Sequence, residues 1–400
     1  MKTLVNKFTL SLISAAILAA PTAFAGETEH GNSITEALSE STVKVNLRAR
    51  YEGVDQDGID KKAAALTLKS RITVNTGSYS NFSLGLEVDK VDALVDDYNS
   101  KTNGNTEYPV VADPQGTDVN QAFIKYANSG FSAVVGRQRV LHNNQRFVGG
   151  VGWRQNEQTY DGVRAQYKAN AFSVDYSYIH NINSITAADV KGEFHLVNAK
   201  YNINKSHKLA GFAYLLDYDA VANYKNSSST VGALYNGKFG KFLVNASLAS
   251  QSDNGDNPTS YSAMYINAEA GYNFGKVTVL GGYELLGSDD GKVAFNTPLA
   301  TKHKFNGWAD KFLGTPKEGL QDVYLTAKGK VSEVKWAATY HDFSSDEGSI
   351  DFGNEIDLVA TYQINKNYGV LVKAANYSEG DSGIAPTDTN KLWVQMTAKF

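Results

Sequence analysis

The chemistry that this sequence offers most clearly is anion recognition by arginine and lysine. Basic side chains recur at alternate positions of extended segments in the first half of the chain, and two glycine-rich loops contain more of them. A guanidinium group forms paired hydrogen bonds with a carboxylate and stays charged at every physiological pH. The cations that we expect to bind anions are Lys44, Arg48, Arg50, Lys69, Arg71, Lys125, Arg137, Arg139, Arg146, Arg154 and Arg164.

A second interpretation is that acidic residues of the same chain neutralise these cations. Glutamate and aspartate occur in neighbouring extended segments, so opposite charges could face each other across the interior. In that case the basic side chains form internal ion pairs and bind no solute. The candidate partners are Glu87, Asp89, Asp161, Asp175, Glu269 and Asp357.

Two loops combine arginine, amide, aromatic and glycine residues. One spans residues 136–156, and the other spans residues 303–312 within the longest connection. Aromatic rings and planar polar groups are suited to binding sugars. We expect the first loop to fold inward and line a constriction, whereas the second could equally pack on itself outside. The constriction candidates are Phe147, Trp153, Gln155, His303, Lys304 and Trp308.

The elements that must position these side chains are β-strands. From residue 42 to the end, about 18 segments alternate apolar and polar residues, most of them near the ~9–11 residues of a tilted membrane strand. An arginine or lysine facing the lipid midplane would cost roughly 2–4 kcal/mol, so the cations should face a water-filled interior. In the segment 131–139 this places Arg137 and Arg139 inward, and it places Ser132, Val134, Gly136 and Gln138 outward.

Short and long connections alternate between these segments. The short ones are rich in Gly, Asn and Ser, as expected of tight turns. In lipid every backbone donor and acceptor must be paired within the protein, so the sheet must close into an antiparallel up-and-down barrel. The pattern predicts short periplasmic turns and long extracellular loops, the latter at residues 53–62, 93–118, 141–159, 181–192, 218–229, 252–261, 287–320, 342–354 and 378–390.

Both ends of the chain carry export signals. Residues 1–25 have a basic start, an apolar run and an Ala-Phe-Ala ending, which predicts a signal peptide cleaved after Ala25. Residues 26–41 form an N-terminal periplasmic segment, in which 33–40 is a short helix or is disordered, and residues 42–400 form the barrel. The last segment alternates apolar and polar residues and ends in Phe400. This ending resembles the sorting signal that the outer-membrane barrel-assembly machinery reads.

Composition excludes several other classes of protein. Without Lys2 and Lys7, 36 basic residues remain against 42 acidic ones, a net charge of −6 that argues against a nucleic-acid binder. The absence of cysteine removes disulfides and thiolate metal sites. The 23 tyrosines and 18 phenylalanines suit the aromatic girdles of a barrel in contact with outer-membrane lipid.

The strand-five Gly-Arg-Gln at 136–138, the loop Asn143 to Gln158 and the stretch His303 to Phe312 resemble the bacterial alginate-export family of outer-membrane porins. The resemblance extends over most of the mature chain in layout, but these motifs carry nearly all its specificity. It implies a monomeric 18-stranded barrel with an electropositive, arginine-lined pore for an anionic polysaccharide. This chain is shorter than a dedicated alginate secretion channel, so the resemblance points to anionic polysaccharides as a class rather than to alginate in particular.

The function that we expect is therefore passive passage of anionic solutes through an outer-membrane channel, in particular acidic oligo- or polysaccharides such as alginate-like uronates, without cofactor or metal. A general diffusion porin is the first alternative. An enzyme in the barrel wall is a remote one, because the seven histidines are scattered without metal-ligand spacing. Acidic loops at 92–97 and 253–256 could bind calcium, although solvated carboxylates are the simpler interpretation.

Overall fold

The computed structural model describes residues 33–400. The predicted signal peptide, its cleavage site after Ala25 and most of the N-terminal segment lie outside the described residues. No helix within 33–400 is both long and apolar enough to cross a membrane.

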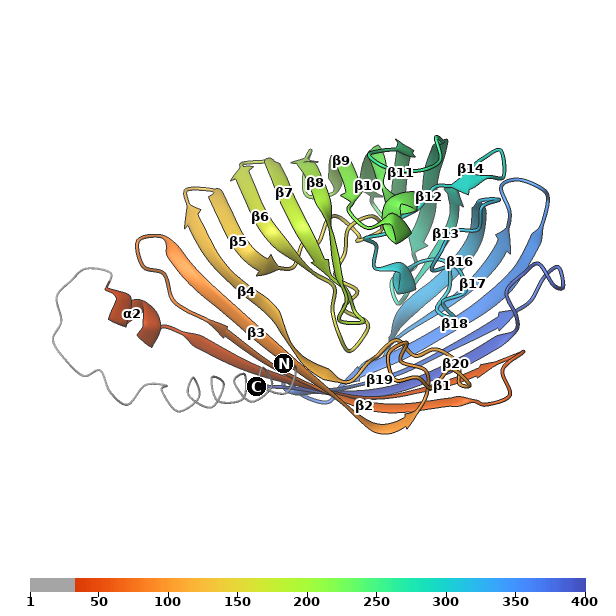
Figure 1. Cartoon of the computed structure of the whole chain (residues 1–400), viewed down its shortest axis with the longest axis horizontal. Coiled ribbons are helices and arrows are strands. Elements are labelled where there is room, and N and C mark those ends of the chain that lie inside the picture. The colour runs from red at the N-terminus through yellow and green to blue at the C-terminus, as the bar shows by residue number, and fades with distance from the viewer. Residues whose placement is uncertain (1–32) are drawn as a thin grey trace.

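Eighteen antiparallel strands form one closed sheet, so the prediction of an up-and-down barrel of about 18 strands is confirmed. Each strand pairs with its neighbour along the chain, and β1 pairs with β20 to close the ring (Figure 1). The strands are β1 (Thr42–Gln56), β2 (Ala63–Asn75), β3 (Phe82–Asp97), β4 (Gly116–Asn128), β5 (Phe131–Gln138), β6 (Thr159–Ala169), β7 (Phe172–Asn183), β8 (Asp189–Asn202), β9 (His207–Tyr218), β10 (Ser228–Phe239), β11 (Phe242–Asp253), β12 (Ser262–Asn273), β13 (Val277–Leu286), β16 (Leu320–Val331), β17 (Val334–Ser344), β18 (Asp351–Gln363), β19 (Tyr368–Ser378) and β20 (Thr389–Lys399).

The two ends of the barrel differ in their connections. At the short-turn end, tight turns join the strands, and helix α2 (Ile34–Ser39) precedes β1 there. Ser33 caps this helix by accepting a hydrogen bond from the Glu36 amide at 3.1 Å, as expected of an N-cap serine. At the long-loop end, the connections contain the hairpin β14 (Ser288–Asp289) and β15 (Val293–Ala294) and the 3-10 turns η1 (Val221–Asn226) and η2 (Lys302–Lys304).

Alternation separates an apolar outer face from a lumenal face along most strands. In β20, Leu392, Val394 and Met396 are each more than 40% exposed, whereas Trp393 between them is fully buried. Aromatic side chains gather beside the short turns, where Phe242 packs on Tyr272 at 4.8 Å and Tyr368 packs on Phe400 at 5.9 Å. An exposed apolar band with an aromatic rim is the surface that a lipid bilayer covers.

Strand β5 has the reverse of the orientation expected from the sequence. Phe131 and Val135 are exposed outer residues, and Val134 lies opposite Lys125 and Arg164 on the lumenal face. Gly136 then adopts φ +118°, and a Cβ there would lie 2.3 Å from the Ala122 carbonyl oxygen. Only glycine fits this left-handed, tightly packed position, which marks the irregular end of the strand.

Candidate pore and its two loops

Two long connections fold into the barrel and contact each other. They are the β5–β6 loop (residues 139–158) and the β13–β16 loop (residues 287–319). A parallel bridge joins Val148 to Leu299, and the Thr301 amide donates to the Gln145 carbonyl at 3.0 Å. The loops therefore obstruct the lumen as one connected unit.

Aromatic residues anchor both loops to the wall. Phe147 packs on Phe212 of β9 at 4.6 Å and on Tyr265 of β12 at 5.1 Å, and its side chain is buried. Phe312 packs in the same way on Phe343 of β17 at 4.6 Å. Phe147 was expected to line the constriction, but its packing makes it an anchor of the loop.

The first group of predicted cations surrounds Glu157 of the β5–β6 loop. Arg71 lies 2.9 Å, Arg139 2.5 Å and Lys69 3.7 Å from its carboxylate. Burial alone would raise the pKa of Glu157, but these three cations hold it well below its usual value. On the wall, Arg71 also binds Asp89 through two hydrogen bonds, and Arg139 binds Glu87. We call these six residues the Glu157 network.

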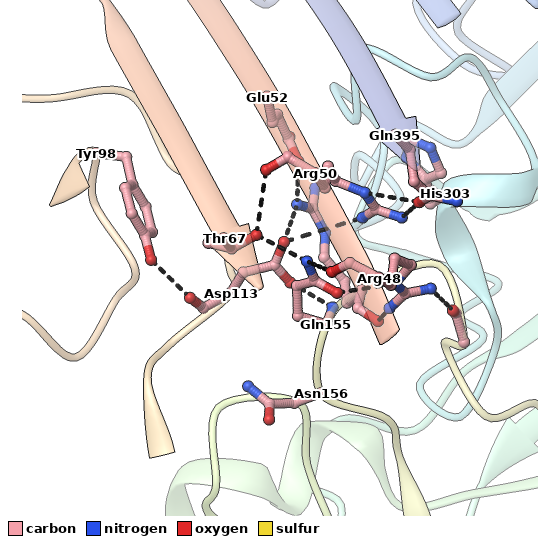
Figure 2. Close-up of polar contacts among 12 residues, drawn as sticks. Arg48, Arg50, Glu52, Thr67, Tyr98, Asp113, Gln155, Asn156, His303 and Gln395 are labelled. Atoms are coloured by element: carbon pink, nitrogen blue, oxygen red, sulfur yellow. Dashed lines mark hydrogen bonds and ion pairs between the residues drawn. The ribbon is translucent and has the colours of Figure 1, made fainter. Parts of the chain in front are cut away.

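A second group on β1 holds the β5–β6 loop through neutral groups. Arg48 donates to the Gln155 side-chain oxygen at 2.8 Å and to the Gly152 carbonyl at 3.0 Å, and it also donates to the Arg154 carbonyl. Arg50 donates to the Gln395 side chain at 2.6 Å on β20. Figure 2 shows the fully buried Gln155 beneath β1 and β2, beside Asp113. The Arg48 contacts fix the loop against the wall, whereas the Arg50 contact joins β1 to β20.

The remaining loop arginines are also paired. Arg146 binds Glu284 of β13 at 2.8 Å and Asn306 at 2.9 Å, and Arg154 binds Glu52 of β1 at 2.9 Å. Burial alone would lower the pKa of both arginines, but the adjacent carboxylates raise it above the usual value, so both stay charged. On the wall, Arg164 binds Asp175.

The internal-pairing interpretation therefore describes much of this charge. Of the six candidate acidic partners, four bind an arginine: Glu87, Asp89, Asp161 and Asp175. Glu269 accepts from Asn245 instead, and Asp357 accepts from the Trp308 amide. Among the eleven predicted cations, the exposed Lys44 and Lys125 are the two without a hydrogen-bond or ion-pair partner in residues 33–400.

Arg137 is not directed toward the lumen, which corrects the sequence-based expectation. It lies opposite Asp161, whereas its neighbour Gln138 lies opposite Tyr160 of the buried core. Because adjacent residues of a strand point to opposite faces, Arg137 and Asp161 lie on the face away from that core. Arg137 binds Asp161 at 2.8 Å and Asp118 at 3.5 Å, and so joins β4 to β6 where the short β5 ends.

Two cavities lie on either side of residues 302–311, a segment that we call the septum. The short-turn cavity has a volume of about 720 Å³, and its lining includes Lys304 and Trp308 of the septum. The long-loop cavity has a volume of about 630 Å³, and its lining includes Lys302, His303 and Asp310. The two cavities share no lining residue, so the septum separates them.

Aromatic stacking and cation–π contacts hold the septum. His303 stacks on Trp153 at 4.8 Å with an interplanar angle of 9°. Lys373 of β19 lies over Trp308 at 3.6 Å and over Trp153 at 4.2 Å. Lys304 donates to the Asn144 carbonyl at 2.9 Å and links the septum to the other loop. The structure thus brings Trp153, His303, Lys304 and Trp308 together.

Most of the cations around the long-loop cavity were not predicted from the sequence. Its lining contains one carboxylate among the described residues, Asp310, against five cations. Arg154 was expected at a functional site, and the other four were not: Lys101, Lys302, Lys311 and Lys391. The position of Lys391 could have been predicted, because it lies two residues before Trp393 in β20 and therefore faces the lumen as well. No sequence pattern indicates the position of the isolated loop lysines.

The described residues contain no group of three or more His, Asp or Glu side chains arranged to hold a metal ion. No such group is found in the acidic loops at 92–97 and 253–256.

Comparisons with known proteins agree with this architecture. The family model described as "Alginate export" matches residues 40–280, so the resemblance expected from the motifs is confirmed. Among solved structures, OccK1 (OpdK) of Pseudomonas aeruginosa has a TM-score of 0.70 at 13% identity, covering 91% of this chain and 99% of that one. OccAB2 of Acinetobacter baumannii has a TM-score of 0.69 at 17% identity, with the same coverage. A search of curated proteins gave no match.

Proposed function

The chain belongs to the alginate export family, and we propose that it is an outer-membrane channel that admits anionic solutes, acidic oligosaccharides in particular. In this proposal the long-loop end faces the cell exterior and the short turns face the periplasm, as is usual for outer-membrane barrels. The long-loop cavity is then the external entrance to the pore.

The observation that carries the proposal is the imbalance of charge in that cavity. Five cations line it, and Asp310 is the one carboxylate among the lining residues of the part of the chain that the structure describes; the cations are Lys101, Lys302, Lys311, Lys391 and Arg154. A pore region lined by Arg and Lys favours anions, because a desolvated anion regains there the interactions that it had with water. A chain of repeated carboxylates could contact several of these cations at once.

Two of the lysines have no acidic partner within the described residues. Burial, together with the charges of Arg146 and Lys101, lowers the pKa of Lys302 to about 8. Burial and the charge of Lys391 lower the pKa of Lys311 to about 8, against the opposing effect of the carboxylates of Glu355, Asp388 and Glu379. A bound anion would oppose this shift, so these ammonium groups gain stabilisation when a carboxylate enters.

The paired arginines have a different part in the proposal. Because acidic side chains or carbonyl oxygens already bind them, they fix the shape of the lumen and the position of the two loops. Selectivity then depends on the cavity lysines. A general diffusion porin remains the alternative that the experiment must separate from this proposal.

Planar-bilayer recordings test the proposal. In a salt gradient the reversal potential of the wild type should indicate anion selectivity, and oligouronates should partly block the current. A Lys101→Gln, Lys302→Gln, Lys311→Gln variant should lose most of both effects. The matched control replaces three exposed loop lysines outside the cavity, Lys225, Lys292 and Lys317.

Each alternative outcome has a clear meaning. Cation selectivity of the wild type would refute the proposal. Anion selectivity without any block by oligouronates would favour a general diffusion porin.

A further inference from the structure

Asp310 occupies a site that resembles a binding site for a carboxylate. Its side chain is 7% exposed and borders the long-loop cavity. One oxygen accepts from Arg154 at 3.1 Å and from Lys391 at 2.9 Å, and the other contacts Nδ1 of His303 at 2.6 Å. Two cations and a ring nitrogen from three separate parts of the chain thus converge on one carboxylate.

The contacts of His303 determine its protonation. Its other ring nitrogen, Nε2, lies 2.7 Å from Nζ of Lys373. An ammonium group only donates hydrogen bonds, so Nε2 must accept, and the single ring proton belongs on Nδ1, directed at Asp310. Burial also lowers the pKa of His303 well below its usual value. The site therefore presents a neutral N–H donor and two cations, which is a complementary set for one carboxylate.

Asp310 also lies in a strained turn of the septum that neighbouring contacts tie to the wall. The amides of Trp308 and Ala309 donate to Asp357 at 3.1 Å and to Glu355 at 2.7 Å on β18. Asp310 itself has φ +63°, a left-handed conformation that is uncommon outside glycine. Gly307 is left-handed too, and a Cβ there would lie 2.3 Å from a Glu355 oxygen. Tertiary contacts hold this strained turn in place, and those of Asp310 are the ones a solute could replace.

We propose that Arg154, Lys391 and His303 form a carboxylate-binding subsite. In the structure, Asp310 occupies this subsite in place of a solute carboxylate. A uronate that enters from the long-loop cavity displaces Asp310 and releases the septum. The proposal rests on the proposed function as a channel for anionic solutes. It adds the site at which such a solute acts and the segment that moves in response.

An exchange of this kind costs little free energy, whereas simple opening costs more. If Asp310 left alone, Lys391 and one side of Arg154 would lose their buried counter-ion, which is strongly unfavourable. An incoming carboxylate restores those contacts one for one. Arg154 keeps Glu52 at 2.9 Å in both states, so the subsite stays in position while its occupant changes.

The test uses the absence of cysteine from the sequence. Ala309 is 2% exposed in the septum, so Ala309→Cys should react slowly with a thiol reagent in the folded barrel and faster when the septum moves. Sodium D-glucuronate is the probe, and D-glucose is its neutral control. The Ala65→Cys variant, at a 1% exposed wall position of β2, reports any general loosening of the barrel.

Asp310→Asn keeps the size of the side chain and removes its charge. With Ala309→Cys as reporter, we expect about tenfold faster labelling without glucuronate, because the septum opens more often when its ionic anchor is weakened. The matched control is Asp290→Asn in the same loop, where the native residue has a similar φ of +54° and an exposed side chain near Lys292. This control should label at the rate of the Ala309→Cys variant without a second substitution. Glucuronate, but not glucose, should accelerate labelling in the Ala309→Cys variant and in the control.

The outcomes separate the two proposals. If a folded Asp310→Asn barrel labels as slowly as the control, or if glucuronate leaves the labelling rate of the Ala309→Cys variant unchanged, the subsite is refuted, while anion selectivity in bilayers would still support the proposed function. Cation selectivity would remove both. If Asp310→Asn does not fold, Lys391→Gln serves instead, with faster basal labelling and a weaker glucuronate effect expected. An unchanged response in that variant refutes the subsite.

Discussion

The Glu157 network and the long-loop cavity are both rich in cations, but only the cavity has more cations than carboxylates among its described residues. In the network, three cations, Lys69, Arg71 and Arg139, face three carboxylates, Glu87, Asp89 and Glu157. Each cation nitrogen lies within 3.7 Å of a carboxylate oxygen. In the cavity, the described lining residues include five cations and one carboxylate, Asp310, which binds Arg154 and Lys391; Arg154 also binds Glu52 behind the lining. A count of basic residues does not distinguish these regions, because compensated charge shapes a lumen and uncompensated charge attracts a solute.

The largest effect should come from Glu157→Gln, which removes the central acid of the network. The buried Lys69 and two partly buried arginines, Arg71 and Arg139, then lose a shared counter-ion, and we expect a loss of about 3 kcal/mol in the free energy of unfolding. Denaturant titration in detergent micelles measures it. Glu107→Gln, which removes an exposed partner of Lys61, should have no measurable effect. Equal stability of the two variants would mean that the Glu157 network does not stabilise the barrel.

An intermediate effect should appear when the pH is varied. Lys302 and Lys311 have a pKa of about 8, so they are charged below that pH and lose their protons above it. Anion selectivity should therefore fall as the pH rises from about 7 to about 9, which lies below the ordinary lysine pKa. Reversal potentials across this range measure it. The variant without Lys101, Lys302 and Lys311 should give a flat profile, and a falling profile in that variant would assign the titration to other groups.

The smallest effect should come from Arg137→Gln. Arg137 joins Asp118 and Asp161 on the face away from the lumenal core, so its removal should leave the reversal potential at the wild-type value. The same recording, made beside the triple lysine variant, provides the scale. A shift as large as that of the lysine variant would mean that Arg137 faces the permeating solute after all.

Much of the barrel could be predicted from the sequence, because its determinants are local. Val394 and Met396 face outward and Trp393 inward on account of a two-residue period within one strand. The prediction failed in β5, where the period runs unbroken to Gln138 but with the two faces exchanged: Phe131 and Val135 are exposed on the outer face, and Arg137 shares that face. For the candidate site, the two loops could be identified from their composition, but the role of Phe147 as an anchor and the importance of Asp310 and Lys302 could not.

The alternating strands, the succession of short turns and long loops, and the number of cations all follow from the order of residues along the chain. Which cations are neutralised depends instead on the folded arrangement, because the partners are distant in sequence: Arg71 binds Glu157, 86 positions away, and Arg154 binds Asp310, 156 positions away. No local pattern encodes such pairings. They depend on where the two loops lie once the sheet has closed. The positive charge available to a solute is the charge that remains after the cations of the chain have paired with its own carboxylates.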